Sequence, residues 1–208
     1  RSETICDSVR GNDQVCVFSS DPEQVLSKAE TRNDIVNKIK ALPPVGEYKL
    51  SEKIRTNKEL HSFIMRMKNL NHKAKVQMDY SSVDLNYANT TQEAQYMLEY
   101  YRKKGYIFIN YSKSNYEESP YAAYSEDFDT HHVIGQEFDK VVMLLDSSFY
   151  YDENGILQGI PHPNPDYLYP NLFYQGVTRV RENLALIVVN APDLFNKVFS
   201  IVKPPECN

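Results

Sequence analysis

Leu184-Ala185-Leu186-Ile187-Val188-Val189 is the longest uninterrupted apolar run in the chain. Six apolar residues are too few to cross a membrane, but they have the length of a strand buried on both faces. Pro192 then begins a segment with helical spacing that continues to Val202, and proline is favoured in the first turn of a helix. Strands that are apolar on both faces are typical of a parallel sheet covered by helices.

The same alternation of strands and helices recurs along the rest of the chain. Hydrophobic spacing predicts helices over residues 30–42, 57–70, 90–104 and 168–183, and strands over residues 14–18, 76–80, 106–109 and 141–145. The pairs Thr56/Glu59 and Thr90/Glu93 have the spacing of capping boxes at two of the helix starts. The chain is therefore predicted to have an α/β fold with a parallel sheet flanked by helices.

One segment interrupts this alternation. Asn154-Gly155, a dipeptide typical of tight turns, separates Phe149-Tyr150-Tyr151 from Ile156-Leu157, which predicts a β-hairpin. A proline-rich stretch follows it, and we interpret residues 147–165 as an insertion into the core architecture.

Composition limits the class of protein. The chain has 208 residues, of which 41% are hydrophobic and 25% charged, as expected of one large globular domain or two small ones. Cys6, Cys16 and Cys207 are scattered, so neither a disulfide framework nor a thiolate zinc site is indicated, and a reducing cytosol is the expected compartment. The net charge of -5 gives no overall attraction to phosphate. The first residue is Arg1, which suggests a piece of a longer protein.

Four short segments carry the chemical signal. They occur in the order Phe18-Ser19-Ser20-Asp21-Pro22-Glu23-Gln24, Leu50-Ser51-Glu52-Lys53-Ile54-Arg55-Thr56, residues 130–142 (THHVIGQEFDKVV) and residues 172–184 (LFYQGVTRVRENL). An NTPase needs donors for the charge that spreads over the γ-phosphoryl oxygens in the transition state, and arginine offers a fixed fork of N–H groups that stays protonated. Arg55 and Arg179 have this chemistry. Gln24 is suited to orient the attacking water or to contact the γ-phosphate.

Together the four segments resemble the later motifs of superfamily 1 helicases. The matching patterns are Asp-Pro-x-Gln, an arginine before a helix, His-x-x-x-Gly-x-Glu-Phe and Tyr-x-x-x-Thr-Arg, and they span most of the chain. The stretch 133–139, with the tyrosine-rich hairpin after it, particularly resembles the Schlafen-like helicase-domain family of bacterial ATP-binding proteins. The resemblance implies a RecA-like second domain over residues 1–208, with residues 1–45 as a candidate for the end of a preceding RecA-like domain.

The resemblance also implies roles for individual residues. Arg179, Arg55 and Gln24 would act in catalysis, whereas Glu137 and Gly135, together with Arg179, would contact the nucleotide, Glu137 at a ribose hydroxyl. Thr130 and His131 would contact a nucleic-acid backbone. The implied function is the carboxy-terminal half of an ATP-dependent DNA or RNA helicase.

The phosphate cradle of such an enzyme is missing from the sequence. No G-x-x-x-x-G-K-[ST] segment occurs, and no acidic pair follows an apolar strand. ATP with Mg²⁺ is therefore expected to bind mainly to an amino-terminal RecA-like domain that precedes this chain. This chain on its own is expected to be inactive. Its other expected partner is single-stranded DNA or RNA, bound weakly by this part of the protein, and no membrane is expected.

Alternatives remain open at this point. The chain could be a non-catalytic module that binds nucleic acid or protein with a helicase-like fold. Glu126, Asp127, Asp129, His131 and His132 could hold a metal, although a solvated loop is the simpler interpretation and no metal site is predicted. The sixteen tyrosines could stack on bases, but tyrosine is also common at the edge of a core. Arg181 is interpreted as a surface charge on a helix.

Overall fold

The computed structural model describes residues 17–18, 25–31, 35–41, 46, 56–73, 78–113, 121–160 and 167–203. Five strands form the main sheet in the order β1-β7-β4-β2-β3, and every neighbouring pair in it is parallel. Their bounds are β1 (Val83–Ala88), β2 (Ile107–Asn110), β3 (Phe128–Asp129), β4 (Phe138–Leu145) and β7 (Val180–Val189). The predicted α/β class, with a parallel sheet flanked by helices, is confirmed.

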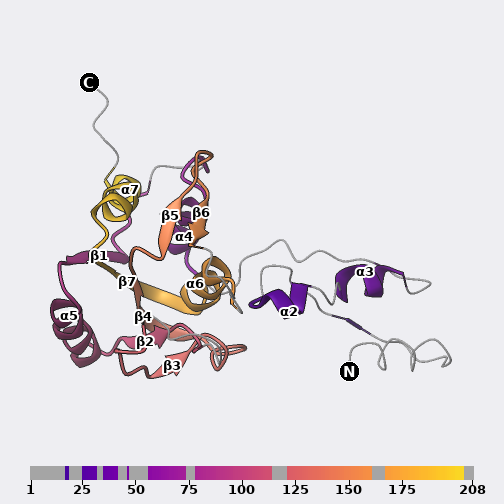
Figure 1. Ribbon diagram of the computed structural model, residues 1–208, viewed down its shortest axis with the longest axis horizontal. Coiled ribbons are helices and arrows are strands. Elements are labelled where there is room, and N and C mark those ends of the chain that lie inside the picture. Colours follow the sequence, from indigo (N-terminus) through magenta and orange to yellow (C-terminus); the bar gives the residue numbers. More distant parts are fainter. Residues whose placement is uncertain are drawn as a thin grey trace.

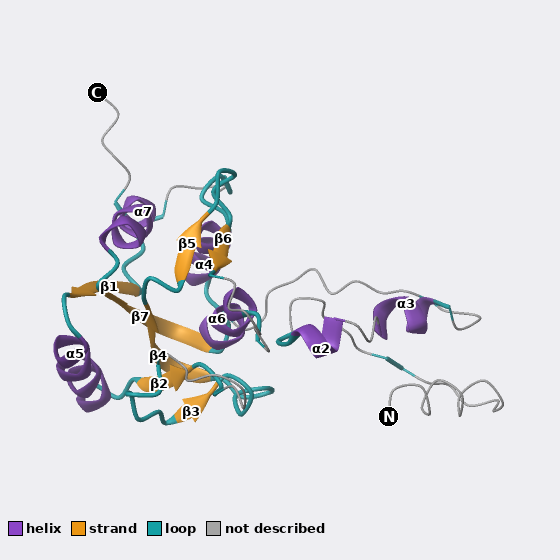
Figure 2. Ribbon diagram, viewed as in Figure 1, coloured by secondary structure: helices purple, strands orange, loops and turns teal. Residues whose placement is uncertain are grey.

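Helices cover both faces of this sheet (Figure 1). α5 (Thr91–Lys103) contacts β1, β2 and β7 on one side, and α4 (Lys58–Lys68) and α7 (Pro192–Val202) pack together on the other. α6 (Tyr169–Val177) contacts β4 and β7. The short helices α2 (Lys28–Thr31) and α3 (Ile35–Lys40) lie beyond α6, away from the sheet (Figure 2).

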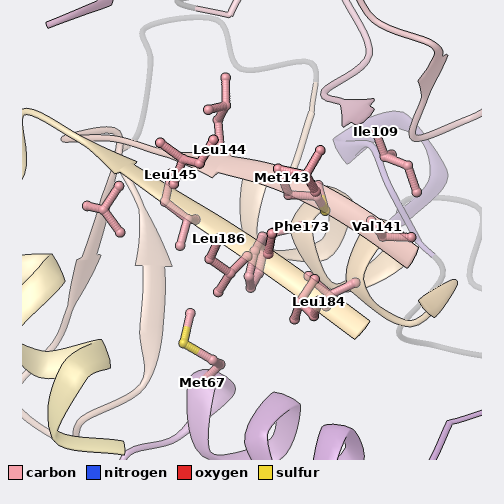
Figure 3. Close-up of a cluster of buried hydrophobic side chains, with 14 of the residues drawn as sticks. Met67, Ile109, Val141, Met143, Leu144, Leu145, Phe173, Leu184 and Leu186 are labelled. Atoms are coloured by element: carbon pink, nitrogen blue, oxygen red, sulfur yellow. The ribbon is translucent and has the colours of Figure 1, made fainter. Parts of the chain in front are cut away.

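The centre of the core lies where β4 and β7 pair. Residues 141–145 and 184–188 are fully buried in register with one another, as expected of strands that are apolar on both faces. Met67 of α4 and Phe173 of α6 point towards Leu184 and Leu186 of β7 (Figure 3). Gly176 allows α6 to approach closely, because a Cβ atom there would lie 2.5 Å from the Sδ atom of the buried Met143.

The predicted hairpin is also confirmed. β5 (Phe149–Tyr151) and β6 (Leu157–Gly159) pair as an antiparallel two-stranded sheet beside α6. Asp152 closes the turn by accepting hydrogen bonds from the backbone N–H groups of Asn154 and Ile156, both at 2.9 Å. Gly155 has a φ of 70°, which favours glycine.

Two capping predictions had different outcomes. At α5, Thr90 accepts a hydrogen bond from the N–H of Glu93, which is one half of the capping box, but the Glu93 carboxylate accepts from the N–H of Asn89 instead of Thr90. At α4, the N-cap is Asn57 rather than Thr56, and its side chain accepts from the N–H of Leu60. Glu59 does not return to the cap, because its carboxylate accepts from the backbone and hydroxyl groups of Ser82 just before β1.

Three other predictions need correction. The strand expected at residues 76–80 is absent at 78–80, the part described, and the edge strand is β1 instead. The helix expected over residues 168–183 ends at Val177, because β7 begins at Val180 and pairs with β4 from there. Arg181 consequently lies on a strand, where it is exposed, and not on a helix. The strand expected at residues 14–18 falls mostly outside the described residues.

The segment before α2 is attached to the first turn of α6. Leu26 is buried, and its carbonyl accepts a hydrogen bond from the N–H of Leu168 at 2.9 Å. The side chain of Asn171 donates to the carbonyl of Val25 at 2.7 Å. Whether residues 1–45 belong to a preceding domain stays a prediction.

Candidate functional site

The third and fourth motif segments meet where β4 and β7 begin. Phe138 pairs with Val180, and the N–H of Phe138 donates to the carbonyl of Arg179 at 2.9 Å. Residues 135–137 directly precede Phe138, and Thr178 and Arg179 directly precede Val180. The parallel pairing of two strands therefore places Gly135 and Glu137 beside the Thr-Arg pair, although the two segments are more than forty residues apart in sequence.

Arg179 lies in the turn between α6 and β7, not in a helix, and its residue is only 3% exposed. Its Nε atom donates to the carbonyl of Gln175 at 3.2 Å, and its Nη2 atom lies 3.5 Å from both Gln175 Oε1 and Thr178 Oγ1. The carbonyl of Gln175 belongs to the last turn of α6, where carbonyls lack helical partners and a positive charge is favourable. The guanidinium is thus held against the carboxyl end of α6.

The segment 131–137 forms a turn with a buried base and an exposed tip. Val133 is fully buried and its carbonyl accepts from the N–H of Gln136 at 3.0 Å. Ile134 is 54% exposed, and Gly135 and Glu137 are also exposed. Gly135 has a φ of 82°, a conformation that favours glycine, and a Cβ atom there would meet nothing within 4 Å. This tip is therefore open to solvent.

Thr130 and His131 join a different cluster, at the ends of β2 and β3. Thr130 is fully buried, and its hydroxyl lies 3.0 Å from that of Ser112. The Nδ1 atom of His131 lies 2.6 Å from Ser112 Oγ, and its ring centroid lies 5.2 Å from that of Tyr167. Thr130 therefore stabilises this segment from the protein interior, whereas His131 is partly exposed. A contact of either residue with nucleic acid stays a prediction.

Asp129 fixes the backbone of this cluster. Its Oδ1 atom accepts from the N–H groups of His131 and His132, at 2.8 and 3.0 Å, and from Ser112 Oγ at 3.2 Å. Its Oδ2 atom lies 2.8 Å from the Nδ1 atom of His132. Partial burial raises the pKa of Asp129, but the hydrogen bonds and the charge of His132 outweigh it, so that the pKa lies below its ordinary value.

The pKa of Asp129 predicts a pH-dependent contribution to stability. Because the folded-state pKa is lowered, the contribution is present above the ordinary carboxyl pKa and is lost as the pH falls through the folded value. We expect Asp129→Asn to lower the free energy of unfolding by about 1 kcal/mol at pH 7, since hydrogen bonds to a charged group contribute more than neutral ones. Urea unfolding between pH 3 and pH 7 measures this difference.

The matched control for this experiment is Asp139→Asn. The Asp139 side chain is 64% exposed and lies 4.0 Å from Arg181, so its removal should change stability little at any pH. An Asp129→Asn deficit that stays constant down to pH 3 would contradict the role of the carboxylate charge.

The acidic and histidine residues around this cluster have other partners. Asp127 accepts from the N–H of Phe108 at 2.8 Å, and Glu126 lies 3.3 Å from the Nζ atom of Lys113. Within the part of the chain that the structure describes, no group of three or more histidine, cysteine or acidic side chains is placed to hold a metal. In the same residues, no helix is long and apolar enough to cross a membrane.

Two predicted catalytic residues, Gln24 and Arg55, lie outside the described residues, so their roles stay predictions. The described tyrosines range from buried to exposed. Tyr111 and Tyr121 are buried in the core, with ring centroids 4.3 Å apart, whereas Tyr96, Tyr100 and Tyr150 are exposed.

Sequence reasoning missed Ser112 and Gln175, which hold the predicted residues in place. Ser112 lies in a loop segment with no motif, so nothing in the sequence distinguished it. Gln175 did carry a signal in the sequence, because it is a polar residue within the segment 172–184, four positions before Arg179, and the structure shows that it is 1% exposed. A buried polar side chain next to a motif arginine is a candidate functional residue.

Comparisons with known proteins give little beyond the fold. No family model matches the chain, and no curated protein matches it. Among solved structures, the chain is similar to one described as the C-terminal domain of a possible DNA helicase from Lactobacillus plantarum WCFS1. That likeness has 11% sequence identity and a TM-score of 0.40, and it covers 71% of this chain and 94% of the other. It is too low to support an inference about activity, which must come from the site itself.

Proposed function

We propose that this chain is the carboxy-terminal RecA-like part of an ATP-dependent, superfamily 1 DNA or RNA helicase-like protein of the Schlafen-like type. In this proposal Arg179 stabilises the charge on the γ-phosphoryl group, and the tip at Gly135 and Glu137 contacts the nucleotide. ATP and Mg²⁺ bind mainly to a preceding RecA-like domain, and single-stranded nucleic acid lies against the Thr130–His131 side. Gln24 and Arg55 contribute to the same nucleotide site.

The observation that carries this proposal is the pairing of Phe138 with Val180. It joins an exposed glycine-containing tip to an arginine anchored at a helix end, and the two belong to the segments 130–142 and 172–184. Catalysis of phosphoryl transfer depends mainly on positioning and on electrostatic stabilisation, so a rigidly placed guanidinium beside an exposed turn is suited to it.

Hydrolysis by two lengths of the protein tests the proposal. We expect the 208-residue chain to hydrolyse ATP no faster than a buffer blank, because it has no G-x-x-x-x-G-K-[ST] segment to cradle the phosphates. We expect the protein from the whole gene to turn over ATP, and single-stranded DNA or RNA to stimulate it. Phosphate release measures both rates.

Preparations carrying Arg179→Ala control for contaminating ATPases. If the 208-residue chain shows turnover and Arg179→Ala does not remove it, the activity comes from a contaminant. If Arg179→Ala does remove it, this chain hydrolyses ATP by itself, which would contradict the proposal that ATP binds mainly to a preceding domain. An inactive whole-gene protein that still binds single strands would favour the non-catalytic binding module.

A further inference from the structure

Gln175 is the one buried polar side chain of α6, and only one of the two polar atoms of its amide has a hydrogen-bond partner. The residue is 1% exposed, and its Nε2 atom has no hydrogen-bond partner among the described residues. Its Oε1 atom lies 3.5 Å from Arg179 Nη2. A buried, unpaired amide donor is destabilising, and such groups are rare enough in native proteins to require an explanation.

The orientation of this amide follows from its neighbour. If the amide were turned over, Nε2 would face the N–H groups of Arg179, and two donors would oppose each other. Only the orientation with Oε1 towards the guanidinium is favourable, and it leaves Nε2 without an acceptor. A leucine in this position would fill similar volume without an unpaired donor, so packing alone does not account for a glutamine.

Gln175 offers two acceptors to one guanidinium. The backbone carbonyl of Gln175 accepts from Arg179 Nε at 3.2 Å and from Thr178 Oγ1 at 3.1 Å, and the side-chain Oε1 faces Nη2. Two acceptors at two different nitrogen atoms of a planar group restrict its rotation about the Cδ–Nε and Nε–Cζ bonds. The Oε1 contact therefore adds a constraint at Nη2 to the one that the carbonyl applies at Nε.

We propose that Gln175 is a positioning residue that sets the orientation of the Arg179 guanidinium for its contact with the γ-phosphoryl group. The inference rests on the proposed function, because it assigns Gln175 a role through Arg179. The unpaired Nε2 is then a local destabilisation retained for activity, a pattern often found at functional sites.

The test compares Gln175→Leu and Gln175→Glu in the whole-gene protein. We expect Gln175→Leu to lower kcat for ATP hydrolysis by about tenfold with KM changed less than about twofold, because a misdirected group affects the transition state more than substrate binding. Its Tm should change little, because removal of the unpaired Nε2 donor offsets the loss of the Oε1 acceptor opposite Arg179 Nη2. Gln175→Glu keeps an acceptor opposite Nη2 and should retain kcat within about threefold.

Two further measurements separate positioning from a general structural role. Gln175→Leu should have no additional effect on kcat in an Arg179→Lys background, because residues that act as a unit are not additive. The matched control Gln92→Leu, at an exposed position in the first turn of α5, should leave kcat unchanged. Equal kcat for wild type and Gln175→Leu, or fully additive effects with Arg179→Lys, would overturn the inference.

Nuclear magnetic resonance of the 208-residue chain distinguishes failure of this inference from failure of the proposed function. We expect rotation about the Nε–Cζ bond of Arg179 to be faster in Gln175→Leu than in the wild-type chain. Faster rotation supports the positioning role of Gln175 even if the whole-gene protein proves inactive. Inactivity of that protein would overturn only the proposed contact of Arg179 with the γ-phosphoryl group. Unchanged rotation overturns the positioning role whatever the ATPase result.

Discussion

Arg179→Lys in the whole-gene protein is expected to lower the turnover number for ATP by at least about a hundredfold. Arginines that contact the transferred phosphoryl group contribute on the order of 10³–10⁵ in turnover. Lysine keeps the charge but lacks the planar fork of N–H groups, so it cannot reproduce the contacts of Nε and Nη2 with Gln175 and also reach a phosphate. Steady-state phosphate release at saturating ATP measures the effect.

Stability has to be measured with turnover in this experiment. Arg179 is 3% exposed and its Nε atom donates to the carbonyl of Gln175 in the last turn of α6, so its change to lysine also affects folding. We expect Arg179→Lys to lower the free energy of unfolding by about 1–3 kcal/mol, the range for losing hydrogen bonds at a buried group. Assays well below the Tm of the variant keep the two effects apart.

Arg181→Lys is the matched control. Arg181 is two residues away on β7, is exposed, and lies 4.0 Å from the exposed Asp139. Its change to lysine should leave both turnover and Tm close to wild type. If Arg179→Lys is as active as Arg181→Lys, then Arg179 has only a structural role and the binding-module interpretation should replace the helicase one.

The sequence correctly predicted elements that are rich in apolar residues and whose ends are marked by a nearby residue such as proline. α7 has the predicted bounds because Pro192 defines its start and its apolar spacing continues without a break to Val202. β1 was missed because Asp84 and Asn86 interrupt its apolar residues, and its strand character depends on parallel pairing with β7. β7 starts earlier than predicted because Val180 and Asn183 near its start pair with β4, a long-range contact that no local pattern contains.

Only part of the candidate site could be predicted from the sequence. Motif spacing pointed to Gly135, Glu137 and Arg179, and the pairing of β4 with β7 brings them together. Motif spacing could not indicate that Arg179 is buried against Gln175, since burial depends on how α6 packs on the sheet. Nor could it separate Thr130, which is buried, from the partly exposed His131 that follows it.

The packing of α6 is expected to be as important to the site as the arginine itself. Phe173 is 2% exposed, points towards β7, and its ring centroid lies 5.9 Å from that of Phe149 on the hairpin (Figure 3). Deleting a buried phenylalanine side chain removes apolar burial and leaves a cavity, which together usually amount to 3–5 kcal/mol. We expect Phe173→Ala to lower the free energy of unfolding by about 4 kcal/mol, measured by urea denaturation of the 208-residue chain.

Phe199→Ala on α7 deletes the same side chain where it is 43% exposed, so it should lower the free energy of unfolding by less than about 1.5 kcal/mol. The difference between the two variants isolates the packing of α6 from the chemistry of the substitution. Because α6 also carries Gln175 and leads directly into Arg179, Phe173→Ala should speed rotation of the Arg179 guanidinium in conditions where the variant is still folded. Equal losses of stability in the two variants would contradict the anchoring of α6 through Phe173.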